Sequence, residues 1–258
     1  MEINGKIALV TGADSGGTGR AIACALAGRG AAVVVNDVDD EGGGRTVGLI
    51  EGAGGRAAFV RADMTLEDEI GAAISFAEST FGGMDILVNN AGGTPRPHFP
   101  DAPVEHWSRT LDLNLRGPMI AIQHALPAMR RRGGGAIVNI SSVAGIGWQP
   151  HSSPEYSAAK AGLARLTATL APLAERDSVR VNCIVPNWIG TEDVLAEIEA
   201  MTPEERAEEG VPDVLTSPEE IADLAARLIE DESLAGRVFV WWTGRGPKAV
   251  PLDDLPGD

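Results

Sequence analysis

The sequence predicts an α/β protein built on a doubly wound parallel sheet with helices on both faces. Short runs rich in Val and Ile alternate along the whole chain with segments of helical length, and such runs suit strands buried on both faces. Strand alternating with helix implies parallel strands joined by right-handed crossovers. No internal repeat, low-complexity tract or linker divides the 258 residues, which lie within the size of one α/β domain.

Seven apolar runs are the candidate strands. In chain order they read KIALVTG, AAVVVND, AAFVRAD, DILVNNAG, GAIVNISS, VRVNCIVP and GRVFVWW. Between them we expect helices over 17–29, 40–52, 65–81, 103–131, 154–176 and 217–230. Thr65 with Asp68, and Ser217 with Glu220, have the spacing of capping boxes at the starts of two of these helices.

The net charge of −16 argues against a nucleic-acid partner, which requires a basic surface. Residues 192–233 hold 15 acidic and 2 basic side chains, so this segment alone carries −13. It is either a pair of solvated helices or a lid that discourages strongly anionic substrates.

The chain start has neither a basic nor an apolar leader region, and no uncharged apolar run reaches the ~18 residues of a membrane span. Cys24 and Cys183 lie in apolar runs without metal-ligand spacing, so we interpret both as core residues and expect no metal site. Two lone cysteines also fit a reducing compartment. We therefore expect a cytoplasmic protein without a membrane partner.

A glycine-rich turn, TGADSGGTG, follows the first candidate strand. Gly12, Gly17 and Gly19 lie where the strand turns into a helix, and there a phosphate needs close approach to backbone N–H groups. Asp37 ends the second strand 18 residues after Gly19, where a dinucleotide fold places the acid that binds the adenosine ribose hydroxyls. A carboxylate there repels a 2′-phosphate, so NAD(H) is favoured over NADP(H). Alternatively, Asp37 only caps the next helix.

The segment EYSAAK, residues 155–160, contains the only tyrosine of the chain, and Lys160 follows Tyr156 by one helical turn. Reducing a carbonyl by hydride leaves an alkoxide that must receive a proton, and a phenol with a pKa of about 10 is a sluggish donor. A cation nearby favours the phenolate and moves the pKa toward neutrality. We therefore predict that Tyr156 is a proton donor and acceptor tuned by Lys160. The alternative is an ordinary surface pair on a helix.

With NNAG (89–92), LDLNLRG (111–117), NISSVAG (139–145) and PNWIGT (186–191), these motifs resemble the short-chain dehydrogenase/reductase family in its compact single-domain branch. The resemblance covers about residues 5–240. It implies one Rossmann-like domain over 1–258 with a seven-stranded parallel sheet, a substrate lid at 188–215 and a C-terminal tail at 243–258.

The resemblance also implies a catalytic tetrad of Asn114, Ser142, Tyr156 and Lys160. Ser142 would hydrogen-bond the substrate oxygen and stabilise developing charge. Lys160 would also hold the nicotinamide ribose, and Asn114 would hold a water that carries protons from Lys160 toward solvent. Only one of Ser141 and Ser142 can face the cofactor, because side chains alternate along a strand, and the family pattern of a serine before VAG selects Ser142.

Further cofactor contacts carry over by position. The full set is Gly12, Gly17, Gly19, Asp37, Asp63, Met64, Asn89, Ala91, Gly92, Tyr156, Lys160, Ile189 and Thr191. Asp63 and Met64 match the stretch that contacts adenine. Asn89, Ala91 and Gly92 would pass behind the nicotinamide ribose, although Asn89 could instead only tie neighbouring strands together. The stretch with Ile189 and Thr191 would bind the carboxamide.

Four departures from the family pattern stand out. The glycine loop is one residue longer, with Thr18 before Gly19, so we expect a bulged loop that still holds the pyrophosphate. The Ser142–Tyr156 interval also has one extra residue, which makes its loop a source of candidate pocket residues: Trp148, Gln149 and His151. Asn187 replaces the usual glycine after the sixth strand, where it tolerates positive φ and where Trp188 could overhang the nicotinamide. The tail lacks the usual Asp-Gly-Gly.

These features predict an NAD(H)-dependent oxidoreductase that interconverts a small or medium, mostly uncharged secondary alcohol and its ketone. One alternative is a 3-oxoacyl-thioester reductase, with residues 130–132 (RRR) facing an acidic carrier protein. The other is a non-catalytic nucleotide-binding protein that kept the fold. Family habit suggests a homo-oligomer, a tetramer or dimer, built on helices 103–131 and 154–176.

Overall fold

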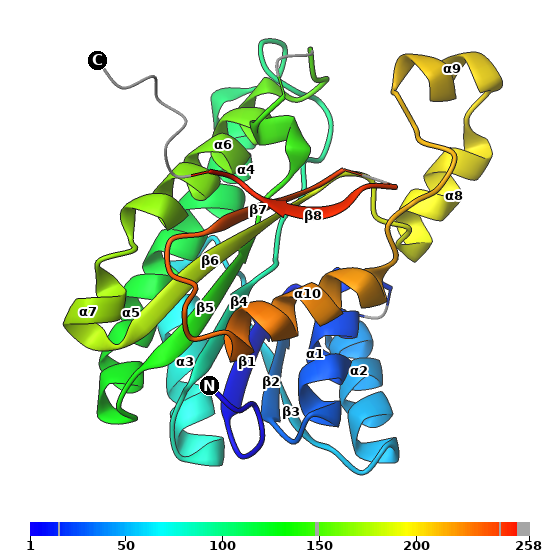
Figure 1. Ribbon diagram of the computed structural model, residues 1–258. Coiled ribbons are helices and arrows are strands. Elements are labelled where there is room, and N and C mark those ends of the chain that lie inside the picture. The colour runs from blue at the N-terminus through cyan, green and yellow to red at the C-terminus, as the bar shows by residue number, and fades with distance from the viewer. Residues whose placement is uncertain (15, 148–149, 243, 252–258) are drawn as a thin grey trace, which may run out of the picture.

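An eight-stranded sheet forms the centre of the protein, in the order β3-β2-β1-β4-β5-β6-β7-β8 (Figure 1). The computed structural model describes residues 1–14, 16–147, 150–242 and 244–251. The strands are β1 (Ile7–Thr11), β2 (Ala32–Asp37), β3 (Arg56–Arg61), β4 (Ile86–Asn89), β5 (Gly135–Ile140), β6 (Val179–Pro186), β7 (Val238–Trp242) and β8 (Gly246–Ala249). Each of the seven predicted runs forms one of the parallel strands β1–β7.

The eighth strand corrects the predicted strand number. β8 lies within the tail and pairs antiparallel with β7, with Pro247 opposite Trp241. Its sequence, GPKA, has no Val or Ile and contains a proline, so it does not resemble a strand. Such a sequence is tolerated because an edge strand needs partners on one side only.

Helices cover both faces of the sheet, as predicted. They are α1 (Thr18–Gly28), α2 (Asp40–Gly52), α3 (Glu67–Phe81), α4 (Val104–Leu111), a π-helical turn (Asp112–Arg116), α5 (Gly117–Arg131), a 3-10 turn (Val143–Gly145), α6 (Pro154–Thr169), α7 (Leu173–Asp177), α8 (Glu192–Ala200), α9 (Pro203–Glu208) and α10 (Pro218–Glu230). One apolar core packs α1 and α10 against the sheet, and a second packs α3 and α5 against its other face. Cys183 lies in a smaller third cluster, whereas Cys24 is half-buried beside the first core.

Two predicted helices are interrupted. The segment 103–131 forms α4 and α5 with the π-helical turn between them. The start of α5 packs closely on the β3–α3 connection, because an added Cβ at Gly117 would lie 2.1 Å from the Met64 carbonyl oxygen. The segment 154–176 divides into α6 and α7 at Pro172, which has no N–H to continue the helix.

The helix caps agree with the sequence in one case of two. Ser217 and Glu220 form the predicted capping box of α10. The box predicted for Thr65 is wrong: α3 begins two residues later, and the Thr65 hydroxyl donates to Asp63 Oδ1 at 2.8 Å. Thr65 is therefore part of the β3–α3 connection. Within the described part of the chain, no helix is long and apolar enough to cross a membrane.

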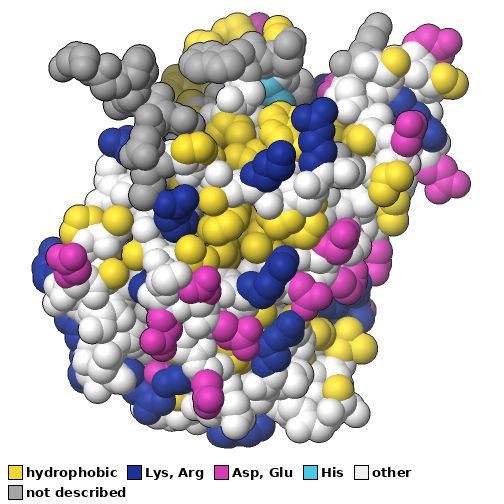
Figure 2. Space-filling model, in the orientation of Figure 1, with side chains coloured by type: hydrophobic (Ala, Val, Ile, Leu, Met, Phe, Trp, Pro, Cys, Tyr) yellow, Lys and Arg dark blue, Asp and Glu magenta, His cyan; other side chains and the backbone are white. Residues whose placement is uncertain are grey.

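The segment predicted as a lid, 188–215, carries α8 and α9, which project from the body at the upper right of Figure 1. Its ends are tied together, because Thr216 N–H donates to the Trp188 carbonyl oxygen at 3.1 Å and Gly190 N–H to the Thr216 carbonyl oxygen at 2.9 Å. Acidic side chains gather over this arm and α10 in Figure 2. Both interpretations of the acidic segment, solvated helices and a lid, are compatible with this arrangement.

Candidate active site

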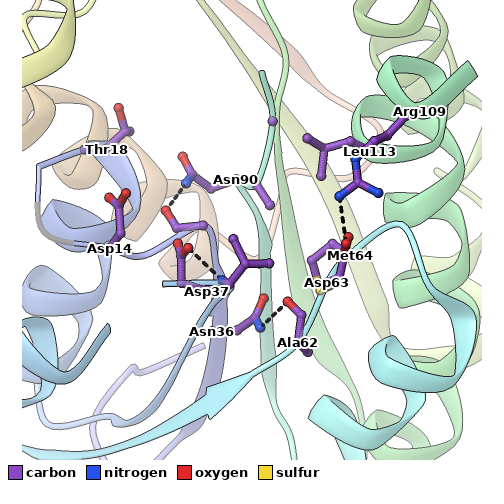
Figure 3. Close-up of a pocket in the computed structure, with 15 residues that line it drawn as sticks. Asp14, Thr18, Asn36, Asp37, Ala62, Asp63, Met64, Asn90, Arg109 and Leu113 are labelled. Carbon is purple, nitrogen blue, oxygen red and sulfur yellow. Dashed lines mark hydrogen bonds and ion pairs between the residues drawn. The ribbon is translucent and has the colours of Figure 1, made fainter. Parts of the chain in front are cut away.

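The strand order reverses between β1 and β4, and a cavity of about 370 Å³ opens there at the carboxyl ends of the strands (Figure 3). Parallel sheets bind ligands at such a switch point. The lining residues are Gly12, Asp14, Gly17, Thr18, Asn36, Asp37, Val38, Ala62, Asp63, Met64, Asn90, Ala91, Gly92, Arg109 and Leu113. Seven predicted cofactor residues are therefore brought together in one cavity: Gly12, Gly17, Asp37, Asp63, Met64, Ala91 and Gly92.

The glycine-rich turn packs against the end of β4. Gly12 has φ +63°, and an added Cβ would lie 2.7 Å from Ala91 Cα, so both its conformation and its surroundings require glycine. Asn90 Nδ2 donates to the carbonyl oxygens of Thr11 at 3.0 Å and Gly12 at 2.8 Å. Gly19 packs beneath this turn against the Gly12 carbonyl and does not line the cavity.

The remainder of the turn leads into α1. Gly17 is the N-cap residue of α1 and lines the cavity, as does Thr18, the residue inserted before Gly19. The helix N-terminus thus faces the cavity, which suits a phosphate. The predicted bulge includes Ser15, which lies outside the described residues.

Two carboxylates, Asp14 and Asp37, face the cavity from the left side of Figure 3. Asp37 Oδ1 accepts the Val38 N–H at 2.7 Å and the Asp39 N–H at 3.1 Å. Burial raises the pKa of Asp37, and the negative charge of Asp14 raises it further, against these hydrogen bonds. Asp39, not Asp37, caps α2, so the capping alternative does not account for Asp37.

A guanidinium crosses the opposite end of the cavity. Arg109 of α4 donates to Asp63 Oδ2 at 2.7 Å (Figure 3). It also donates to Thr65 Oγ1 at 3.3 Å. Burial alone would raise the pKa of Asp63, but Arg109 and Thr65 hold it below its usual value. The Asp63 carboxylate is therefore charged and already bound on both oxygens.

Asn36 supplies a test of whether a nucleotide fits. Its Nδ2 donates to the Val60 and Ala62 carbonyl oxygens, while its buried Oδ1 has no hydrogen-bond partner among the described residues. A buried acceptor left without a donor is uncommon. Because Asn36 lines the cavity, its Oδ1 is suited to accept a hydrogen bond from a ligand, such as one from the amino group of an adenine.

The predicted catalytic residues converge next to this cavity. Tyr156 hydrogen-bonds the Ser142 hydroxyl, and Lys160 Nζ lies 5.4 Å from the centroid of the Tyr156 ring. Ser142 Oγ also accepts the Ala144 N–H at 3.2 Å, which fixes its orientation. Ser141 turns the other way and donates to the Lys160 carbonyl oxygen at 2.7 Å. The alternation predicted for this serine pair is therefore present.

Gly92 lies where Lys160 and Asn114 approach each other. An added Cβ at Gly92 would lie 2.8 Å from Asn114 Oδ1 and 3.0 Å from Lys160 Nζ. Asn114 is fully buried in the π-helical turn, and its Nδ2 donates to the Gly93 and Thr110 carbonyl oxygens at 2.8 and 2.9 Å. Such π-helical turns are frequent at functional sites.

The pKa predicted for Tyr156 is wrong for the protein without ligand. Burial raises the pKa of Tyr156 above its ordinary value, and only the hydrogen bond with Ser142 lowers it. Lys160 does not offset this, because burial lowers its own pKa from 10.5 to about 8 and its Nζ donates to the Ile140 carbonyl oxygen at 2.9 Å. The i, i+4 spacing correctly placed the two side chains together, but burial has the larger effect on both.

Four other predicted positions lie outside the cavity. Asn89 is buried, and its Nδ2 donates to Asn139 Oδ1 at 2.8 Å, which is the strand-tying alternative. Ile189 and Thr191 lie at the base of the α8–α9 arm, where Thr191 Oγ1 caps α8. His151 stacks on Tyr156 with ring centroids 5.9 Å apart.

The remaining departures have different outcomes. Trp148 and Gln149 lie outside the described residues. Ser178 is the only described non-glycine residue with positive φ, so Asn187 makes its turn without the left-handed conformation.

Sequence reasoning missed Asp14, Asn36, Asn90 and Arg109. Asn90 belongs to NNAG, and the second asparagine, not the first, reaches the cavity. Asp14 lies in the glycine-rich turn, where an acid beside a phosphate site is itself a signal. No sequence signal indicated Arg109, because it comes from α4, 46 residues beyond Asp63.

Lys160 predicts a testable effect on stability. Between pH 8 and 10.5 the Lys160 side chain keeps its proton in the unfolded chain but has lost it in the folded protein. The free energy of unfolding therefore rises with pH in this range, and below pH 8 the buried ammonium destabilises the folded protein. We expect Lys160→Met to raise the free energy of unfolding at pH 7 by up to about 3 kcal/mol. Urea unfolding at pH 7 and 9 measures this, with the exposed Lys248→Met as control. A variant less stable than wild type at pH 7 would contradict the assignment.

Comparison with known proteins identifies a family and several relatives of this chain. A family model described as short chain dehydrogenase matches residues 6–202. The cis-4-hydroxycyclohexanecarboxylate dehydrogenase of Sinomonas cyclohexanicum is 40% identical over 234 residues, which cover 88% of this chain and 90% of that protein. The cyclohexanol dehydrogenase of Acinetobacter sp. (strain SE19) is 36% identical, with 90% of each chain covered.

A solved structure of 7α-hydroxysteroid dehydrogenase, complexed with NADH and 7-oxo glycochenodeoxycholic acid, has the same architecture. It superposes with a TM-score of 0.83 at 32% identity and covers 95% of both chains. The match of the family model over most of the chain, together with these relatives, decides the classification. The chain belongs to the short-chain dehydrogenase/reductase family of oxidoreductases, which act on hydroxyl groups with a nicotinamide cofactor.

Proposed function

We propose that the protein is an NAD(H)-dependent dehydrogenase that interconverts a cyclic secondary alcohol and its ketone. The observation that carries this proposal is the convergence of Ser142, Tyr156 and Lys160 beside a cavity lined by Asp37. A hydroxyl, a phenol and an ammonium in contact are what proton transfer to a substrate oxygen requires. The relatives named for cyclohexanol and for cis-4-hydroxycyclohexanecarboxylate support a ring-bearing substrate.

The cavity fits a nicotinamide dinucleotide. Gly12 and Gly17, with the N-terminus of α1, would hold the pyrophosphate, Asp37 the adenosine ribose, and Asn36 Oδ1 an amino group of the base. A bound nicotinamide would supply the hydride acceptor or donor and, in its oxidised form, a positive charge.

Proton transfer falls to the side chains of the chain itself. Tyr156 holds the proton that passes between its phenol and the substrate oxygen, and Ser142, fixed by the Ala144 N–H, orients that oxygen. Lys160, held by the Ile140 carbonyl, stabilises the phenolate that forms on Tyr156 when the ketone is reduced. Its pKa of about 8 lets it exchange protons near neutral pH. Asn114 Oδ1 approaches Lys160 Nζ across Gly92 and would complete the path toward solvent.

Preference for NAD(H) over NADP(H) follows from two carboxylates at the adenosine end. Asp37 and Asp14 both face the cavity, and each repels a 2′-phosphate. The only arginine among the residues that line the cavity, Arg109, is bound to Asp63 and so does not offset them.

The acidic arm supports an uncharged substrate. Residues 192–215, which include α8 and α9, rise beside the end of β6 that leads to Asn187 (Figure 1). Residues 192–233 carry a net charge of −13, and a field of one sign disfavours anions at the entrance.

The alternative function, a 3-oxoacyl-thioester reductase that binds an acidic carrier protein, has less support from the structure. Each arginine proposed as its contact is already paired: Arg130 with Asp177, Arg131 with Glu78, and Arg132 with Asp85. A carrier would have to displace these ion pairs, so the alcohol dehydrogenase is the better supported function.

Tyr156→Phe tests the proposed chemistry. The variant keeps the ring but loses the transferable proton, so kcat should fall by about 10²–10⁴. The assay follows NADH absorbance with cyclohexanone and substituted cyclic ketones, and NADH binding by fluorescence should stay within about twofold of wild type. Val104→Ala, an exposed position on α4, is the control. Turnover retained in the phenylalanine variant, or no wild-type turnover of any ketone, would contradict the proposal.

Replacing the two cavity carboxylates tests the coenzyme preference. Asp14→Ser and Asp37→Ser should each raise the affinity for 2′,5′-ADP relative to ADP by about tenfold, because each removes a charge that faces the 2′-phosphate. Titration calorimetry measures this without turnover, with Asp68→Asn, an exposed acid on α3, as control. If wild type binds 2′,5′-ADP as tightly as ADP, the preference for NAD(H) is wrong.

A further inference from the structure

Glu155 is a buried acid that the proposed chemistry does not use. Its side chain is 3% exposed, although it lies in the first turn of α6 directly before Tyr156. Acids are seldom buried unless they are paired. Burial would raise the pKa of Glu155, but its own and the Phe99 backbone N–H groups, together with the nearby Ser153 and His98 side chains, hold that pKa below its usual value. The helix N-terminus also favours a negative charge here.

The carboxylate reaches across to the segment that follows β4, residues 93–103. Oε2 accepts the Phe99 N–H at 3.4 Å. Oε1 lies 3.3 Å from His98 Nδ1, an ion-pair distance without the alignment of a hydrogen bond, and the His98 side chain is only 11% exposed. Both side chains are therefore largely shielded from water, and this strengthens the electrostatic interaction between them.

A second contact joins the same two segments. Ser153 is the N-cap residue of α6, yet its hydroxyl makes no cap bond within the described chain and instead lies 2.5 Å from Thr94 Oγ1. Thr94 Oγ1 is in turn 3.4 Å from His98 Nδ1. Serine at this position ordinarily caps the helix. The start of α6 thus gives up that bond in favour of contact with residues 93–103.

The beginning of segment 93–103 is held by another predicted catalytic residue. Gly93 N–H donates to Asn114 Oδ1 at 3.2 Å, and Asn114 Nδ2 donates back to the Gly93 carbonyl oxygen at 2.8 Å. Further along, the His98 carbonyl oxygen accepts the N–H groups of Asp101 and Ala102. The segment is therefore fastened at three points: to Asn114 at its start, and to Ser153 and Glu155 at the start of α6.

We propose that Glu155 and His98 are positioning residues that hold segment 93–103 against the start of α6 as one wall of the substrate site. The pair keeps that wall in a fixed position relative to Tyr156, which is the next residue after Glu155 in the first turn of α6. The role of this wall in substrate binding rests on the proposed function, whereas the attachment of segment 93–103 to α6 does not depend on it.

Two variants test the pair. Glu155→Gln keeps the shape and can still accept the Phe99 N–H, but it loses the charge that faces His98; His98→Gln removes the other partner. We expect each to raise KM for the cyclic ketone about tenfold, with kcat changed less than about threefold and ADP binding unchanged. The double variant should be no worse than the more impaired single variant, because both remove one interaction. Asp101→Asn, an exposed acid of the same segment, is the control.

Hydrogen exchange gives a readout that does not need turnover. Amides of residues 93–103 should exchange at least about fivefold faster in both variants than in wild type, while amides of β1 and β5 keep their rates. Unchanged exchange in 93–103, faster exchange throughout the sheet, an equal effect of Asp101→Asn, or a loss in kcat without a change in KM would each overturn the proposal. If wild type turns over no ketone but the exchange results hold, the proposed function fails and the attachment stands.

Discussion

The structure of this site depends on one buried cation. Lys160 lies 3% exposed at the carboxyl end of the sheet, where its ammonium has the Ile140 carbonyl as an acceptor and the Tyr156 ring nearby. Burying an ammonium without a carboxylate partner is costly, and its pKa falls accordingly. The fold bears this cost beside the cavity, as is expected if the ammonium serves the proposed chemistry and not stability.

The sheet holds that cation in place through polar contacts within its own layers. Asn89 of β4 bonds Asn139 of β5, and Asn139 Nδ2 bonds Thr167 Oγ1 of α6 at 2.9 Å. This chain crosses two strands and reaches the helix that carries Tyr156 and Lys160. Because every member is buried and bonded, these hydrogen bonds restrict the rotation of α6 relative to the sheet.

The electrostatics of the site therefore have two states. Without ligand, low polarity dominates: the phenol keeps its proton and the ammonium gives its proton up more readily than in water. A positive charge near the phenol lowers the pKa of Tyr156, since it favours the negatively charged phenolate. Burial therefore sets the pKa values of Tyr156 and Lys160 in the protein alone, and the pKa of Tyr156 would fall only when the cavity holds a positively charged ligand.

Sequence patterns predicted the parts of the molecule that have local causes. The seven parallel strands follow from Val and Ile runs, and the Tyr156–Lys160 contact follows from helical spacing. What sequence could not predict depends on distant partners. β8 is a strand only because β7 offers a free edge, and Arg109 reaches Asp63 only because α4 folds over the cavity. The raised pKa of Tyr156 likewise depends on burial, which no local spacing reports.

The most direct measurement is a spectroscopic titration of Tyr156, which is unambiguous because the chain has a single tyrosine. Ionised tyrosine absorbs at longer ultraviolet wavelengths than the protonated form, so difference absorbance follows the titration. We predict a pKa above the free-peptide value of about 10 in the protein alone, and a lower pKa when NAD is bound. A phenol that titrates near 10 in both states would contradict this prediction.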